Sequence, residues 1–143
     1  MTIFRDDTER WAEFSCVRVV GSFKELVETP FAEGVNAMCW PRELRGDFAE
    51  VVTKVVELAG DEEIVSLDAE ALMSLELSAT GRDARAVLMA DLARLSEQSL
   101  EPNLDCIPAY SSDGEEGVFS TDVYGWHADA APVIADTYLC SYT

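Results

Sequence analysis

Apolar residues recur at three- and four-residue spacing in the middle third of the chain, which predicts amphipathic helices. The clearest helix covers residues 47–59, and Gly60 follows it where a C-terminal cap belongs. Two further helices are expected over residues 68–77 and 83–100, separated by Thr80-Gly81. The apolar positions thus place most helical structure between residues 44 and 100.

The second helix of this pair carries a mostly apolar stripe that includes one carboxylate, at Asp91. A stripe of this width is typical of a helix that turns one face to a core. We therefore expect residues 83–100 to pack against the rest of the domain.

The pattern changes after residue 102, where β-branched and aromatic residues become frequent. Residues 104–107 are expected to form a strand, and residues 111–117 a loop. Residues 118–119 and 123–124 are expected to be short strand pieces, and residues 133–142 have the strongest strand pattern of the chain. Strands are therefore predicted to dominate residues 103–143.

The first third of the chain has weaker periodicity. Residues 1–34 are expected to be a leader with short helices, one over residues 8–14 and one opened by a capping box of Ser22 and Glu25. Residues 35–40 are expected to be a buried strand that Pro41 ends.

Helices followed by strands indicate an α+β class, with N-terminal helices packed on an antiparallel sheet or partial double-stranded β-helix. The expected organisation is the leader, 1–34, and one α+β domain over residues 35–143. A second short strand is expected to start at Ile64-Val65. The expected core consists of apolar positions shared by the periodic stripes: Trp40, Phe48, Val52, Val55, Leu88, Leu92 and Leu139.

Composition limits the function classes. The chain has 143 residues, 48% of them hydrophobic, and a net charge of −18 from 28 acidic and 10 basic residues. No Lys or Arg follows Arg94, so an acidic field covers the last third of the chain. Such a field repels phosphate backbones, which argues against direct nucleic-acid binding, and it would attract a cation or a basic protein partner.

No apolar stretch approaches the ~20 residues that a membrane span needs, and the charged start does not resemble a signal peptide. We therefore expect a cytoplasmic protein without a membrane anchor. The cysteines are far apart in the sequence and are expected to be buried, reduced thiols: Cys16, Cys39, Cys106 and Cys140.

The residues that indicate chemistry are His127 and Asp129. In an extended segment, residues separated by one position point to the same side, so both side chains can reach one atom. An imidazole and a carboxylate suit a divalent metal, and with a second histidine they form the facial triad of non-haem Fe(II) oxygenases. The alternative is a histidine held by a nearby carboxylate for structural reasons.

Two sequence blocks carry a resemblance. Residues 125–129, Gly-Trp-His-Ala-Asp, with residues 139–143, Leu-Cys-Ser-Tyr-Thr, resemble the motif of an uncharacterised bacterial family. Residues 34–42, Gly-Val-Asn-Ala-Met-Cys-Trp-Pro-Arg, are similar to that family's upstream block. The family resembles the double-stranded β-helix (cupin) domains of Fe(II)/2-oxoglutarate dioxygenases, which implies His127 and Asp129 as metal ligands.

The chain departs from that pattern in its ligand set. His127 is the only histidine, and no Lys or Arg follows the motif to pair with 2-oxoglutarate. Asp136, seven positions after Asp129, is a further carboxylate that could serve as a third ligand. The expectation is therefore a fragment ending within the motif, able to use 2-oxoglutarate only if a downstream segment exists, or an inactive homologue. The alternative function is an acidic, non-catalytic module that binds a basic protein or mimics nucleic acid.

Overall fold

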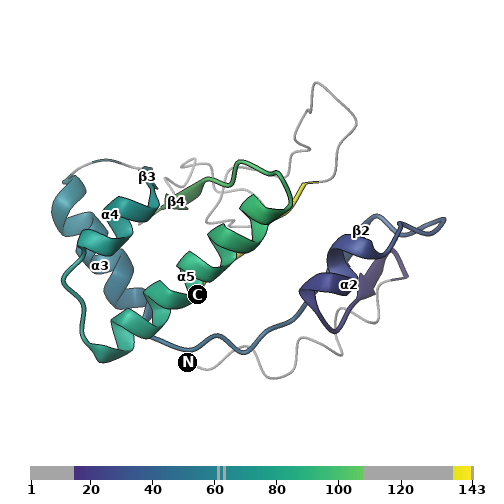
Figure 1. Cartoon of the computed structure of the whole chain (residues 1–143), viewed down its shortest axis with the longest axis horizontal. Coiled ribbons are helices and arrows are strands. Elements are labelled where there is room, and N and C mark those ends of the chain that lie inside the picture. The colour runs from purple at the N-terminus through teal and green to yellow at the C-terminus, as the bar shows by residue number, and fades with distance from the viewer. Residues whose placement is uncertain (1–14, 61, 63, 108–136, 143) are drawn as a thin grey trace, which may run out of the picture. The chain divides into compact units, whose positions relative to one another are not determined.

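The computed structural model describes residues 15–60, 62, 64–107 and 137–142. The chain divides into two compact units, Met1–Glu43 and Leu44–Thr143. It is a mixed α+β protein, whose described part contains four helices and two sheets of two strands each (Figure 1). The helix expected over residues 8–14 and the elements expected between residues 111 and 124 lie outside the described residues.

The first unit contains strand β1 (Val17–Val19), helix α2 (Phe23–Glu28) and strand β2 (Ala37–Cys39). The two strands pair in parallel, and α2 lies in the connection between them, as parallel pairing requires a crossover. The Val20 backbone N–H extends the pairing by donating to the Cys39 carbonyl at 2.9 Å. The strand expected within residues 35–40 is confirmed, but its expected burial is corrected, since Ala37 is exposed and Met38 and Cys39 are only half-buried. Its partner β1 was not foreseen in the leader, which was expected to carry short helices.

Local capping explains where α2 begins. The Ser22 side chain accepts a hydrogen bond from the Glu25 backbone N–H at 3.1 Å, which satisfies one of the donors that a helix start leaves over. The Glu25 carboxylate accepts from the Gly21 N–H at 2.7 Å. This reciprocal arrangement confirms the predicted helix start, and the helix ends before Pro30 as expected.

Trp40 lies in the first unit and is only partly buried. Its ring centre is 6.2 Å from that of Phe23, and the Arg42 guanidinium lies 5.0 Å above it. Its assignment to a common core with Val55 and Leu88 was therefore wrong. The Trp40 ring lies beside Phe23, the first residue of α2, in its own unit.

The second unit contains helix α3 (Phe48–Ala59), strand β3 (Val65–Leu67), helix α4 (Ala69–Ser74), helix α5 (Ala79–Glu97) and strand β4 (Leu104–Cys106). Strands β3 and β4 pair antiparallel, and both were expected near these positions. None of the described helices is long and apolar enough to cross a membrane. Helix α3 thus confirms the prediction made from periodicity, and both expected strands are present.

Helix α5 starts earlier than the sequence indicated. Its N-cap is Ser78, whose side chain accepts from the Gly81 backbone N–H at 3.2 Å. Thr80-Gly81 therefore belongs to the first turn of α5, and the expected break there is corrected. Position 81 suits a glycine, because a side chain there would collide with the neighbouring Glu50 carboxylate.

The core of the second unit lies between its three helices and the β3–β4 pair. Its buried members are Val51, Val55, Leu72, Leu75, Ala84, Leu88 and Cys106, with Phe48 and Leu92 packed against them. Val52 is 39% exposed, because α3 buries the face of its neighbours Val51 and Val55 instead. The expected burial of Val52 was therefore wrong.

The C-terminal segment also differs from its prediction. Residues 137–142 form no strand, and Leu139 is 88% exposed. Residues 133–136 lie outside the described residues. The expected burial of Leu139 and the expected strand over 137–142 are corrected, because side-chain anchoring of Tyr142 replaces backbone pairing there.

Candidate functional site

The predicted metal ligands His127 and Asp129, and the reserve ligand Asp136, lie outside the described residues. Their convergence on one side of an extended segment therefore stays a prediction. Among the described residues, no group of three or more histidine, cysteine or acidic side chains could hold a metal ion. The polar features of the described residues are the exposed carboxylates, the contact between Glu50 and Ser78, and the buried Asp91.

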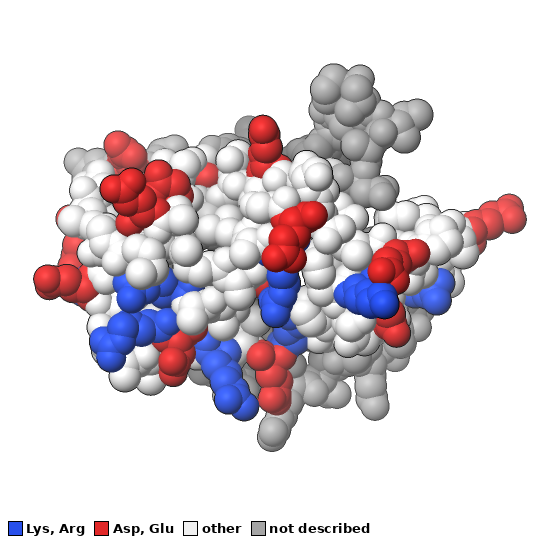
Figure 2. Space-filling model, viewed as in Figure 1, with Lys and Arg blue, Asp and Glu red and all other residues white. Residues whose placement is uncertain are grey.

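Exposed carboxylates are the main surface feature. Every described acidic residue except Glu50 and Asp91 is exposed. Figure 2 shows acidic side chains spread over the drawn face. Some basic side chains form hydrogen bonds within the chain. The Arg85 guanidinium, for example, donates to the carbonyls of Leu72, Met73 and Leu75 at 3.1–3.3 Å. That arginine satisfies carbonyls at the end of α4.

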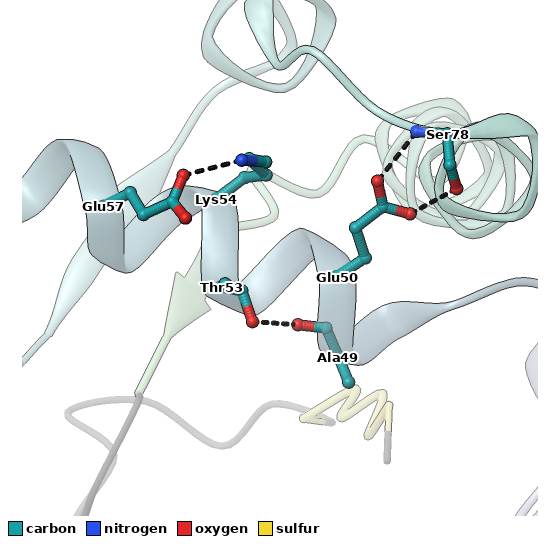
Figure 3. Close-up of polar contacts among 6 residues, drawn as sticks. All are labelled: Ala49, Glu50, Thr53, Lys54, Glu57 and Ser78. Atoms are coloured by element: carbon teal, nitrogen blue, oxygen red, sulfur yellow. Dashed lines mark hydrogen bonds and ion pairs between the residues drawn. The ribbon is translucent and has the colours of Figure 1, made fainter.

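A polar junction joins α3 to the start of α5 (Figure 3). The Glu50 carboxylate accepts from the Ser78 backbone N–H at 2.7 Å and from the Ser78 hydroxyl at 2.5 Å. These bonds, the side-chain one first, lower the pKa of Glu50 below its ordinary value. A negative charge at a helix start is also favoured by the peptide dipoles. Glu50 therefore places a carboxylate of the same chain at the N-terminus of α5.

Lys54 lies one turn further along α3, and its positive charge also favours the ionised form of Glu50. Its ammonium donates to the Glu57 carboxylate at 2.7 Å, which raises the pKa of Lys54 (Figure 3). The Thr53 hydroxyl donates back to the Ala49 carbonyl at 2.9 Å. Both contacts are local to α3, since they join residues three and four positions apart.

Asp91 is a carboxylate buried on α5, with its side chain 5% exposed. Its Oδ1 accepts from the Arg94 guanidinium at 2.8 Å, and its Oδ2 accepts from the Tyr142 hydroxyl at 2.9 Å. The Tyr142 ring stacks on Phe48 with centres 5.5 Å apart. Tyr142 therefore contacts both α3 and α5, although it lies 51 positions from Asp91 in the sequence. The sequence signal that could have found it was the lone carboxylate in the apolar stripe of α5.

Burial and the bond to Asp91 raise the pKa of Tyr142 above its ordinary value. The neutral phenol is therefore the form that the folded chain stabilises. The contribution of Tyr142 to stability is complete below pH 10, and it falls as pH rises above 10, because the unfolded tyrosine ionises first.

A Tyr142→Phe variant tests this pH dependence. At pH 7 it should lose about 1.5–3 kcal/mol of unfolding free energy, the usual range for a hydrogen bond to a charged group. The difference between wild type and variant should shrink between pH 10 and 11.5, as measured by urea unfolding. A difference that stays constant over this range would show that the hydroxyl does not titrate as described.

The cysteines carry no disulfide: all four are free thiols. Burial raises the pKa of Cys106 and that of Cys39, so both stay protonated and unreactive near neutral pH. Cys106 is buried as expected, whereas Cys140 is exposed because it lies on the C-terminal segment. The expected burial is confirmed for Cys106, but it is corrected for Cys16 and Cys39, which are only half-buried, and for Cys140.

The described geometry therefore offers an acidic surface and a buried carboxylate that receives a tyrosine hydroxyl. No protein-family model, curated protein or solved structure matches the chain.

Proposed function

We propose that this chain is an acidic, non-catalytic module that binds a basic protein partner. The observation that supports the proposal is the exposure of nearly all described carboxylates in a chain of net charge −18. Complementary charge accelerates association and excludes partners of like charge. The same field repels phosphates, so the partner is a protein and nucleic acid is not bound directly.

The second unit is the better binding surface. It contains the packed core, and exposed acids lie on α4, in the connection to α5 and in the first turns of α5: Glu70, Glu76 and Asp83. A basic segment that lies across these helices would meet carboxylates held on rigid elements. This arrangement favours a defined complex over diffuse attraction.

Charge reversal on one surface tests the proposal. The probe is a lysine-rich 20-residue peptide, titrated calorimetrically onto wild type and onto Glu70→Lys/Glu76→Lys/Asp83→Lys. We expect one peptide per chain, affinity that falls with salt, and a loss of at least tenfold in the triple variant.

The matched control has the same charge change in the first unit: Glu28→Lys/Glu33→Lys/Glu43→Lys, all at exposed positions. It should retain most of the affinity. Equal losses in both triple variants, or several peptides bound per chain, would mean a general acidic field and would overturn the proposal of a module.

A second proposal rests on the His127 and Asp129 motif and its resemblance to oxygenase domains. The two side chains would bind Fe(II) in a domain whose helices pack on an antiparallel sheet or a partial double-stranded β-helix. Two protein ligands leave most coordination positions to water, so binding would be weak. Oxygenase chemistry with 2-oxoglutarate would need a second imidazole and a basic group from outside the 143 residues, since His127 is the only histidine.

Anaerobic titration with Co(II), a surrogate for Fe(II), tests this site on wild type, His127→Ala and Asp129→Ala. The expected result is weak binding that both substitutions abolish. Asp136→Ala shows whether a third carboxylate contributes. If wild type and Asp129→Ala bind Co(II) equally, the pair is structural and the metal proposal fails.

A further inference from the structure

Among the described residues, the Tyr142 side chain joins the end of the second unit to that unit's helices. We name residues 137–142 the strap; Tyr142 stacks on Phe48 and donates to Asp91. Within the described residues, no backbone hydrogen bond joins the strap to another segment. Thr137, Leu139, Cys140 and Ser141 are exposed, Leu139 at 88%, whereas Tyr138 is half-buried. The strap can therefore be displaced without breaking the backbone hydrogen bonds of a sheet.

Phe48 and Asp91 form the site that receives Tyr142, here named the tyrosine socket. Phe48 is the first residue of α3, so its ring lies at the end of a rigid helix. Asp91 is buried on α5, and Arg94 holds its other oxygen. When Tyr142 leaves, a buried carboxylate loses a hydroxyl donor and the Phe48 ring loses its stacking partner, both at a cost in free energy. The socket therefore prefers an aromatic ring that carries a hydroxyl group.

Tyr142 occupies the tyrosine socket although the strap has no positive charge that the acidic chain could attract. Residues 137–142 contain no Lys or Arg, although the chain has a net charge of −18. Exposed carboxylates lie near the socket in sequence, with Asp47 beside Phe48 and Glu97 at the end of α5. A tyrosine flanked by lysines would make the same ring and hydroxyl contacts and would add attraction to these acids.

We propose that the tyrosine socket is a docking site for a tyrosine in a basic segment of a protein partner, and that Tyr142 occupies it in the isolated chain as an autoinhibitory strap. The proposal rests on the proposed binding of a basic partner and names the feature that is recognised. An intramolecular strap acts at a high effective concentration, so the partner must gain affinity from its lysines to displace it. The strap therefore selects against tyrosines without flanking basic residues.

Three synthetic peptides of nine residues test the proposal on the full chain. The first has a central tyrosine with two lysines on each side, the second replaces the tyrosine by phenylalanine, and the third replaces the lysines by serine. Each is titrated by calorimetry onto wild type and onto Tyr142→Ala, which empties the socket. The lysine–tyrosine peptide should bind Tyr142→Ala at least about tenfold more tightly than wild type, because no strap competes.

Two comparisons assign that gain to the socket. On Tyr142→Ala, the phenylalanine peptide should bind about tenfold more weakly than its tyrosine counterpart, and the serine peptide should also bind more weakly. Adding Asp91→Ala to Tyr142→Ala should remove the preference for tyrosine over phenylalanine. Circular dichroism verifies folding of each variant. If Tyr142→Ala unfolds, Tyr142→Phe replaces it, and there the gain over wild type should be about threefold.

Failure of the socket and failure of the acidic module give different results. If both lysine peptides bind equally to wild type and to the Tyr142 variant, charge alone drives binding and the socket proposal is overturned while the module stands. If neither lysine peptide binds either chain, both proposals fail. Tighter binding of the serine–tyrosine peptide than of the lysine–tyrosine peptide would overturn the role of charge in displacing the strap.

Discussion

Replacing Leu72 with alanine should lower the free energy of unfolding by about 2–5 kcal/mol, because the side chain has no exposed surface and its loss leaves a cavity. Leu72 lies on α4, at the centre of the core formed by the helices and Cys106. Helix α4 has only six residues, so its position depends on this packing more than on its own helical stability. Urea unfolding followed by circular dichroism measures the loss.

The neighbouring Met73→Ala variant is the matched control. Met73 lies on the same short helix and is 58% exposed, so its truncation removes little buried surface. Its unfolding free energy should stay within about 0.5 kcal/mol of wild type. A Met73→Ala loss as large as that of Leu72→Ala would mean that α4 presents the other face to the core.

Local signals were sufficient to predict α3. Asp47 accepts from the Glu50 backbone N–H at 2.9 Å, and Gly60 ends the helix at a positive φ of 68°. Both features act between residues close in sequence, so the apolar spacing and the two caps specify the helix together. The strands over 65–67 and 104–106 were also recognisable from their residues, although their pairing was not.

The start of α5 could not be derived from local pattern alone. Thr80-Gly81 is a sequence typical of a break, yet Ser78 caps the helix and Glu50 on α3 accepts from the Ser78 backbone and hydroxyl. That contact spans 28 positions in the sequence, and no periodicity indicates it. Tertiary contact therefore outweighed the local preference of the glycine.

The strap shows the same limit for strand prediction. Its β-branched and aromatic residues suit a strand, but strand propensity depends on what the segment packs against. Here Tyr142 finds its partners in Phe48 and Asp91 on two helices. The signal for this site was present in the sequence as Asp91, a charge where the stripe of α5 called for an apolar residue. The His127 and Asp129 site stays a prediction, since both residues lie outside the described part.

A Gly46→Ala variant should be strongly destabilised, because an added Cβ would overlap the Ala84 backbone. Gly46 precedes α3 at a φ of +114°, a conformation that residues with a side chain rarely adopt. The loop before α3 is also held close to α5 by a hydrogen bond from the Asp47 backbone N–H to the Thr80 carbonyl at 2.9 Å. Backbone strain of ~1–3 kcal/mol is thus joined by a clash that only movement of α3 from α5 relieves.

The control is Gly60→Ala, at the other end of the same helix. Gly60 also has a positive φ, of +68°, but nothing lies within 4 Å of the position that its Cβ would take. It therefore carries the strain without the clash, and Gly46→Ala should exceed its loss by about 1–3 kcal/mol, the usual cost of overpacking. Urea unfolding of both variants measures the difference. Equal losses would show that the loop before α3 can move away from Ala84, and that the contact between α3 and α5 does not depend on the missing side chain at Gly46.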